Sequence, residues 1–267
     1  MNRKNRGLSL IVQWLAAISL MVLGGGMSAH AGLFGLGGTS WQEEVLLHDG
    51  RTIVVERTQT YGGRNEPGQP EPIREHSISF TLPSQNKSVT WTSEYGEDIG
   101  RTNFDLLAVH VLNDTPYLVT TPNLCLSYNK WGRPNPPYVF FKHDGDTWQR
   151  IPLSEFPAEF KTINVALDIR GQGVENLEKL GRVSAEQIKA LNAHVKQPHY
   201  KTIVREPYPT VEGKYVEGCP EMIRTKSGWD GLGFFRSKPT YEMCVEYCSR
   251  RGVSPQDCPC ARLFKEE

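Results

Sequence analysis

The six cysteines of this sequence have a spacing that predicts covalent crosslinks. Their number is even and five of them fall in the last 49 residues, as expected for a disulfide framework in an exported protein. They are Cys125, Cys219, Cys244, Cys248, Cys258 and Cys260.

Two pairs of these cysteines are placed to bond with each other. Cys244 and Cys248 are four residues apart and share one face of an expected helix. Cys258 and Cys260 are two apart and share one face of an extended segment. We expect the helix pair to bond to the tail pair, with the individual partners left open. The first two cysteines of the chain would then bond to each other.

A zinc site is the alternative for the same four sulfurs. Cys-x₃-Cys followed by Cys-x-Cys could place four thiolates around the ion. Neither spacing is the common Cys-x₂-Cys arrangement, and an exported protein meets an oxidising compartment. The disulfide interpretation is therefore favoured, and we expect no metal and no cofactor.

Three carboxylates next to aromatic residues are the candidates for catalysis. Glu94, Glu97 and Asp98 follow Trp91 and flank Tyr95. Two carboxylates near aromatics suit a glycosidase, but a solvated acidic turn accounts for the same residues and is favoured. The sequence has no Gly-x-Ser-x-Gly, His-Glu-x-x-His, Walker or dinucleotide motif. Catalytic residues are therefore not assigned.

A stretch rich in proline and aromatic residues, at 128–138, is the candidate binding surface. It carries Tyr128, Trp131 and Tyr138 together with three prolines. Such a stiff loop can stack on sugar rings or grip an extended peptide. In the alternative interpretation Trp131 closes the end of a sandwich, because large aromatic side chains are mostly buried.

The elements that must position these residues are mainly strands. Asp-Gly turns and period-two alternation predict about eight strands in hairpins. The expected pairs are 45–47 with 52–56, 76–82 with 89–92, 104–112 with 117–121, and 138–141 with 148–153. This pattern predicts an antiparallel β-sandwich or barrel-like sheet, with a small helical, disulfide-rich C-terminal region.

Two helices are expected after the strands. Ser184 and Gln187 have the spacing of a capping box, which predicts a helix over 185–196. Thr240 as N-cap and Gly252 as C-terminal stop predict a second helix over 241–251.

The first residues have the pattern of an export signal. Three cations precede an apolar run, and Ala29 and Ala31 form a small-x-small cleavage site. An uncleaved anchor is the alternative, although the run is short for a span. We expect a signal peptide at 1–31, a flexible lead-in at 32–40, a β-domain at 41–170, a helical connector at 171–200 and a Cys-rich region at 201–267.

The charge of the chain argues against nucleic acid as a partner. The sequence has 30 Lys and Arg against 30 Asp and Glu, and the leader carries three of the cations and no acid. Removing the leader leaves a net charge of −3, whereas a nucleic-acid surface needs excess cations. No later segment has the length and apolarity of a membrane span.

In five segments the sequence resembles a family of exported proteins of Gram-negative bacteria. These segments are the leader, residues 41–56, the 129–138 loop, residues 148–153 and the closing Cys-Pro-Cys. This resemblance implies export but no activity, cofactor or catalytic residue. We expect a periplasmic or secreted, disulfide-stabilised binding protein without catalysis, whose partner is a protein or glycan of the cell envelope. The alternative is a hydrolase of envelope glycans or peptides that uses Glu94, Glu97 or Asp98.

Overall fold

The computed structural model describes residues 38–65, 67–82, 84, 86–167, 169–209 and 218–264. The expected leader, with Ala29 and Ala31, and residues 32–37 lie outside the described residues. Strand β1 begins at Gly38, so residues 38–40 belong to a sheet and not to a flexible lead-in.

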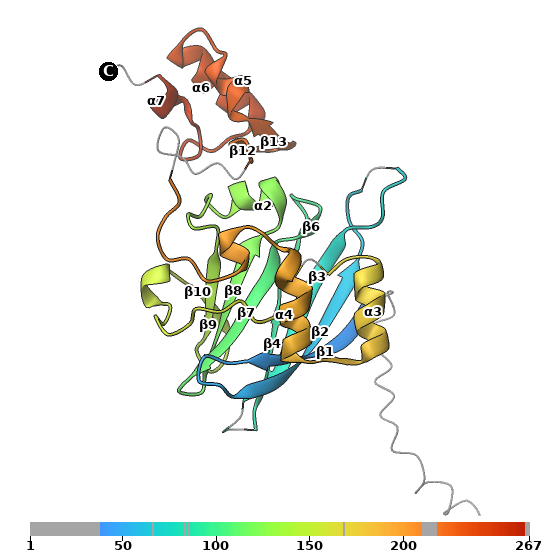
Figure 1. Ribbon diagram of the computed structural model, residues 1–267. Coiled ribbons are helices and arrows are strands. Elements are labelled where there is room, and N and C mark those ends of the chain that lie inside the picture. Colours follow the sequence, from blue (N-terminus) through green and yellow to red (C-terminus); the bar gives the residue numbers. More distant parts are fainter. Residues whose placement is uncertain are drawn as a thin grey trace, which may run out of the picture. The chain divides into compact units, whose positions relative to one another are not determined.

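Two mainly antiparallel sheets form the body of the protein (Figure 1). A five-stranded sheet has the order β11-β1-β2-β3-β4, with β1 at Gly38–Leu46, β2 at Thr52–Tyr61, β3 at Ile73–Thr81, β4 at Ser88–Thr92 and β11 at Arg182–Val183. A four-stranded sheet has the order β10-β9-β8-β7, with β7 at Phe104–Leu112, β8 at Thr115–Pro122, β9 at Val139–His143 and β10 at Trp148–Ile151. The predicted mainly β fold is confirmed, and the described strands do not close into a barrel.

The four predicted hairpins are present, because their turns and alternation are local signals. Gly50 ends the first turn with φ at 85°, a conformation that glycine adopts without strain. A short pair, β5 at Tyr95–Gly96 and β6 at Arg101–Thr102, was not predicted.

One face of the five-stranded sheet is buried and the other carries hydroxyl groups. Hydrogen bonds join Thr58 to Ser77, Ser79 to Thr90 and Thr81 to Ser88 across neighbouring strands of the outer face. The inner face shares one apolar cluster with the four-stranded sheet. Members of this cluster from both sheets include Val45, Val55, Ile78, Trp91, Phe104, Val109 and Leu118.

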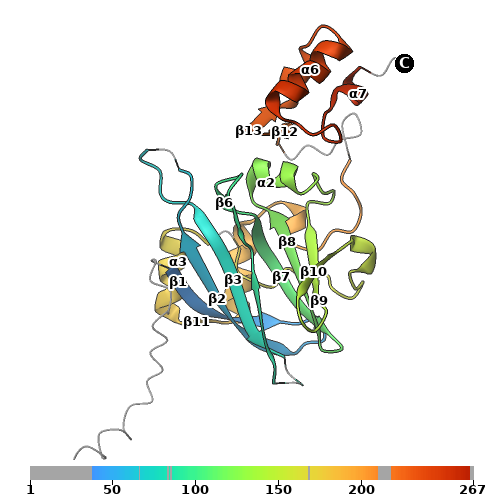
Figure 2. The same cartoon turned by 180° about the vertical axis from the view of Figure 1, so that it is seen from behind.

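Two helices cover one end of the inner face of this sheet. Helices α3 (Gln172–Leu180) and α4 (Ala185–Leu191) lie on the same side of it, and Figure 2 shows the opposite face free of helices. They form a separate apolar cluster around Trp41 of β1. The predicted capping box is present, since Ser184 Oγ accepts the N–H of Gln187 at 3.3 Å. The helix ends at Leu191 and continues as the short 3-10 turn η2 (Asn192–His194), while α3 was not predicted.

Short 3-10 turns connect the remaining segments of the β-domain. They are η1 at Leu153–Glu155 and η3 at Pro198–Tyr200. Between them, Asn164 is hydrogen-bonded to both backbone groups of Val109 on β7, at 2.9 and 2.7 Å. These bonds hold the segment before α3 against the four-stranded sheet.

The C-terminal region has its own small core. It contains β12 (Met222–Thr225), β13 (Gly228–Gly231), α5 (Leu232–Arg236), α6 (Tyr241–Arg251) and α7 (Cys260–Leu263). Helix α6 has the predicted ends, with Thr240 Oγ1 accepting the N–H of Met243 and Gly252 left-handed at φ 66°. Disulfides Cys244–Cys260 and Cys248–Cys258 join α6 to the tail, which is the layout that the spacing predicted.

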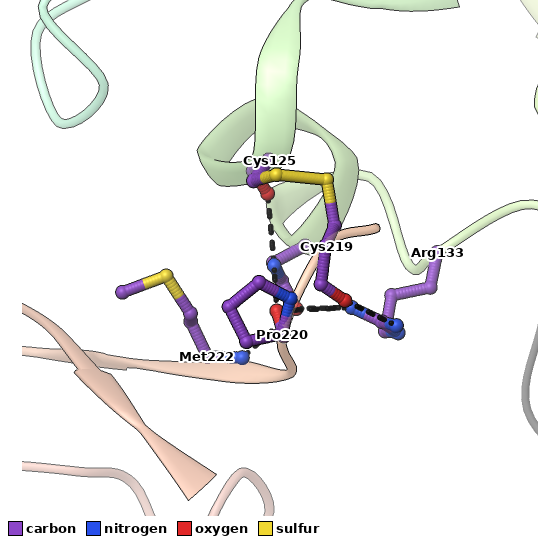
Figure 3. Close-up of a disulfide and its surroundings, with 6 residues drawn as sticks. Cys125, Arg133, Cys219, Pro220 and Met222 are labelled. Atoms are coloured by element: carbon purple, nitrogen blue, oxygen red, sulfur yellow. Dashed lines mark hydrogen bonds between the residues drawn. A yellow bond between two sulfur atoms is a disulfide. The ribbon is translucent and has the colours of Figure 1, made fainter. Parts of the chain in front are cut away.

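The third disulfide, Cys125–Cys219, joins this region to helix α2 (Leu124–Lys130) (Figure 3). Beside it, Arg133 donates hydrogen bonds to the carbonyls of Cys219 at 3.1 Å and Pro220 at 3.2 Å. Asn129 accepts the N–H of Met222 at 2.9 Å. A covalent bond and a polar network therefore hold the same junction. None of the helices in the described ranges has the length and apolarity that a membrane span requires.

Candidate ligand-binding site

The three aromatic residues of the predicted binding loop contribute to packing. Tyr128 and Tyr138 are both only 3% exposed. The Tyr138 hydroxyl lies 2.9 Å from the carbonyl of His199. Trp131 is half-buried, with its ring centre 4.5 Å from that of Phe104. Binding through these side chains stays a prediction.

The following part of the same loop borders a hollow in the surface. A cavity of about 390 Å³ lies between the loop and strand β10. Its lining includes Pro134, Pro136, Tyr138, Arg150, Pro152 and Leu153. Arg150 is the one charged side chain among its described lining residues, so this hollow has few groups that could orient a ligand.

The carboxylates proposed for catalysis do not line any of three cavities found among the described residues. Glu94 and Glu97 are exposed. Asp98 forms an ion pair with Lys130 at 2.9 Å and another with Arg224 of the C-terminal region at 3.9 Å. Within the described ranges, none of the three carboxylates lines the cavity beside β10 or the two larger cavities of about 490 and 580 Å³. None of these three cavities therefore brings two of the three carboxylates together.

A set of buried polar groups that includes Arg57, Gln59 and His76 lies at one end of the inner face of the five-stranded sheet. A cavity of about 490 Å³ opens there, between strands β2, β3 and β7 on one side and residues 166, 167, 169, 170, 194–197 and 200 on the other. We call it the main cavity. Its polar lining includes Arg57, Gln59, His76, Asp105, Arg170 and Lys196. Its apolar lining includes Ile73, Leu106, Leu107, Leu167, Ile169 and Val195.

Strand alternation explains why charged residues reach this buried face. On β2 the inward positions carry Ile53 and Val55 and then Arg57 and Gln59. On β3 the inward position before Ile78 carries His76. The cavity was not predicted from the sequence. Its available sign was a charged residue at a strand position whose alternation points toward the buried face.

A buried ion pair supports the back of the main cavity. Arg57 Nη1 lies 3.0 Å from Glu43 Oε1, and Arg57 also donates to the carbonyl of Ala166 at 2.8 Å. Glu43 in turn accepts hydrogen bonds from the Trp41 indole at 2.7 Å and from the backbone N–H of Ala166 at 3.0 Å. This network fixes the position of the guanidinium group in the cavity wall.

A histidine–aspartate pair is part of the lining of the main cavity. His76 Nε2 lies 3.2 Å from Asp105 Oδ1. Asn123 donates to both carboxylate oxygens, at 3.0 and 2.9 Å. The Asp105 side chain is 31% exposed and the His76 side chain 6% exposed. The carboxylate is thus held by two neighbours and still has contact with solvent.

The environment lowers the pKa of both the imidazole and the carboxyl group. Burial lowers the pKa of His76, and the hydrogen bond that His76 donates to Asp105 opposes this shift without reversing it. Burial raises the pKa of Asp105, but the hydrogen bonds from His76 and Asn123 and the positive charge of Arg170 outweigh it, so the pKa is lowered overall. A neutral imidazole that donates from Nε2 has a lone pair on Nδ1. This Nδ1 is buried and has no hydrogen-bond partner within the described structure.

A second cavity of about 580 Å³ adjoins the main one. The two share Ile73 and Arg170, and Asn123, the partner of Asp105, lines the second. Its other lining residues are mostly polar and include Thr39, Tyr61, Asn65, Gln69, Arg101 and Glu175. The His76–Asp105 pair therefore lies close to the boundary between an apolar-sided cavity and a polar one.

The described His, Cys, Asp and Glu residues form one group whose ligand atoms are close enough for a metal ion. It consists of Cys248, Cys258 and Cys260, whose sulfurs lie within 4.8 Å of one another. All three are bonded in disulfides, which leaves no thiolate to bind an ion.

Searches among protein families, curated proteins and solved structures gave no match to this chain. The resemblance to exported proteins of Gram-negative bacteria therefore stays a prediction, and function must be argued from the site.

Proposed function

We propose that the protein is an exported, disulfide-stabilised binding protein without catalysis, and that its ligand is a small molecule with an apolar part held in the main cavity. The observation that carries this proposal is the combination of a cavity of about 490 Å³ with apolar sides and a few fixed polar groups. Binding sites for small molecules have this size and this distribution of polarity.

The polar groups of the cavity are arranged before any ligand arrives. Arg57 is fixed by Glu43 and Ala166, and Asp105 is fixed by His76 and Asn123. A site whose groups are already in place loses less conformational freedom on binding, which favours affinity. His76 Nε2 is bonded to Asp105, and its Nδ1 has no partner among the described residues, so within them the imidazole is hydrogen-bonded to no hydroxyl or thiol that it could activate.

A fluorescent apolar probe tests this function. N-phenyl-1-naphthylamine is dim in water and bright in an apolar site, so its titration reports occupancy of the cavity. Val195 is a half-buried lining residue, and Val195→Trp should fill the space and weaken binding about tenfold or more. Leu191→Trp is the matched control, because Leu191 is 42% exposed and is not part of the lining. Equal binding by both variants would reject the proposed function.

Export is the second part of the proposal. Three disulfides are typical of proteins in oxidising compartments, which supports a periplasmic or secreted location. Cleavage after Ala31 is supported by the sequence pattern alone. Intact-mass measurement of the protein from its native host tests it, and a mass that still includes residues 1–31 would reject cleavage.

A further inference from the structure

Beyond the proposed function, we propose that the C-terminal region contains a site for modification by thiols. In this reaction a thiol is added to Cys258, and the Cys244–Cys260 bond then exchanges with a Cys248–Cys260 bond. Contact between the two disulfides of this region leads to this chemistry. The reaction is stoichiometric and involves no lining residue of the main cavity, so it is compatible with a binding protein.

The two disulfides of the C-terminal region touch each other. Cys260 is bonded to Cys244. Its sulfur also lies 3.4 Å from that of Cys258 and 3.6 Å from that of Cys248, although it is bonded to neither. A disulfide forms at a separation of about 2.05 Å, so a shift of roughly 1.5 Å would complete a bond with either neighbour. A thiolate released from one disulfide therefore lies beside a sulfur of the other, which is the arrangement that exchange requires.

Burial decides which of the four sulfurs a thiol from solution meets. Cys244 and Cys260 are 0% exposed, and Cys248 is 3% exposed. Cys258 is only half-buried. Because attack on a disulfide needs access to a sulfur, the incoming thiolate reaches Cys258. The partner of Cys258 in the disulfide, Cys248, is then the leaving group.

The exchange has two steps, and each breaks one S–S bond and forms another. In the first, the thiolate bonds to Cys258 Sγ, and Cys248 leaves with the electron pair of the broken bond. In the second, the Cys248 thiolate bonds to Cys260 Sγ, and Cys244 leaves as a thiolate. Cys244 takes up the proton that the incoming thiol lost. The products contain two disulfides and one thiol, as the reactants do, so no further oxidant or reductant is needed.

The two bonding patterns bury their free thiol to a similar extent. The thiol lies on Cys248 before the second step and on Cys244 after it, at positions 3% and 0% exposed. Each pattern also keeps one disulfide between helix α6 and Cys260. We therefore expect both patterns to be populated once the first step has taken place.

The disulfide at the junction differs in its surroundings. Cys125 is half-buried, as Cys258 is, so it can meet the same thiol. The sulfurs of Cys248, Cys258 and Cys260 lie within 4.8 Å of one another, whereas Cys125 and Cys219 belong to no such group among the described residues. We therefore expect the Cys125–Cys219 bond to open and close without exchange.

Mapping the bonds after treatment with a thiol tests the site in the full-length protein. The protein is incubated with glutathione at about pH 8, where thiolates form. It is then acidified, its free thiols are blocked with N-ethylmaleimide, and its peptides are sequenced by tandem mass spectrometry. Cleavage after Glu246 separates Cys244 from Cys248, so the blocked residue is identified directly.

We expect glutathione on Cys258 and blocked thiols on both Cys244 and Cys248. A blocked thiol on Cys248 alone, with the Cys244–Cys260 bond intact, overturns the exchange. A short peptide with one cysteine is the second probe. The faster probe shows whether the natural thiol belongs to a small molecule or to a protein, and no adduct on Cys258 with either probe overturns the site.

A single substitution tests the second step without any added thiol. Cys258→Ser leaves Cys248 as a free thiol beside Cys260. We expect blocked thiols on Cys244 and Cys248 in comparable amounts. Cys125→Ser is the matched control, and there the free thiol should stay on Cys219. A thiol confined to Cys248 in the first variant, or spread over other cysteines in the control, overturns exchange through the contact with Cys260.

Discussion

Arg57 and Glu43 form an ion pair that water hardly reaches, with their side chains 3% and 0% exposed and 3.0 Å between Nη1 and Oε1. The pair joins neighbouring strands β1 and β2, and both residues also bind the backbone of Ala166. Each buried charge is therefore compensated by the other and by few further groups.

Removing one partner of this pair should destabilise the fold strongly. We expect Arg57→Met to lower the free energy of unfolding by about 3–5 kcal/mol, because it leaves the Glu43 carboxylate buried without its counterion. Urea denaturation measures this. Arg51→Met is the matched control, since Arg51 pairs with Asp49 at the surface and its side chain is 50% exposed. The control should change by less than about 1 kcal/mol. Equal effects would contradict the prediction.

A buried histidine should make stability depend on pH. Burial lowers the pKa of His110 from 6.5 to about 4, although the hydrogen bond to the Thr162 carbonyl opposes the shift. As pH falls from about 6.5 toward 4, the unfolded chain binds the proton first, and so stability is lost. The pKa difference corresponds to about 3 kcal/mol.

His110→Gln should remove this part of the pH dependence. The free energy of unfolding in urea is measured at several pH values between about 4 and 6.5, for the variant and for the original protein. His194→Gln is the control, because His194 is exposed after α4. If the original protein and the His110 variant lose stability in parallel as the solution is acidified, the prediction is wrong.

The disulfide at the junction should contribute more than the short one in the tail. Cys125 and Cys219 are 94 residues apart, whereas Cys248 and Cys258 are 10 apart. In the chain-entropy account, the long loop is worth about 4–5 kcal/mol and the short one about 3 kcal/mol. Paired Cys→Ser variants at each site, compared by urea denaturation, measure the difference. If loss of the Cys248–Cys258 bond lowers the free energy of unfolding more than loss of Cys125–Cys219, loop length does not determine how much these disulfides stabilise the protein.

Replacing the tryptophan of the proline-rich loop should affect stability and not the main cavity. The Trp131 ring packs on Phe104 at 4.5 Å and lies under the Arg150 guanidinium at 5.5 Å. We expect Trp131→Ala to cost about 2–4 kcal/mol in unfolding free energy. Binding of N-phenyl-1-naphthylamine should persist. A variant of unchanged stability would favour the surface-binding role that the sequence predicted for this residue.

The sequence predicted the elements whose signals are local. The hairpins followed from turn residues and alternation, and helices α4 and α6 followed from their N-caps, Ser184 and Thr240. Helix α2 was missed, because it starts at Leu124 in a left-handed conformation, φ 61°, and has no side-chain cap. Its last residues lie within the stretch that was expected to be a loop.

The main cavity could not be predicted by the same means. His76 and Asp105 are 29 residues apart, and Arg57 and Ala166 are 109 apart. Tertiary packing alone brings such residues together, and no short motif encodes it. The inward phase of Arg57 and His76 could have indicated a buried polar site, but not its position or its ligand.

The parallel pairing of β11 with β1 imposes an order on folding. Gln42 of β1 binds the carbonyl of Gly181, and it faces Arg182 across the sheet. Gln42 and Arg182 are 140 residues apart. A chain that leaves the ribosome or the export channel N-terminus first therefore exposes one edge of β1 until most of the protein has emerged. An unpaired strand edge can pair with other chains. The growing chain is therefore most prone to aggregate before its residue 182 is available to pair with β1.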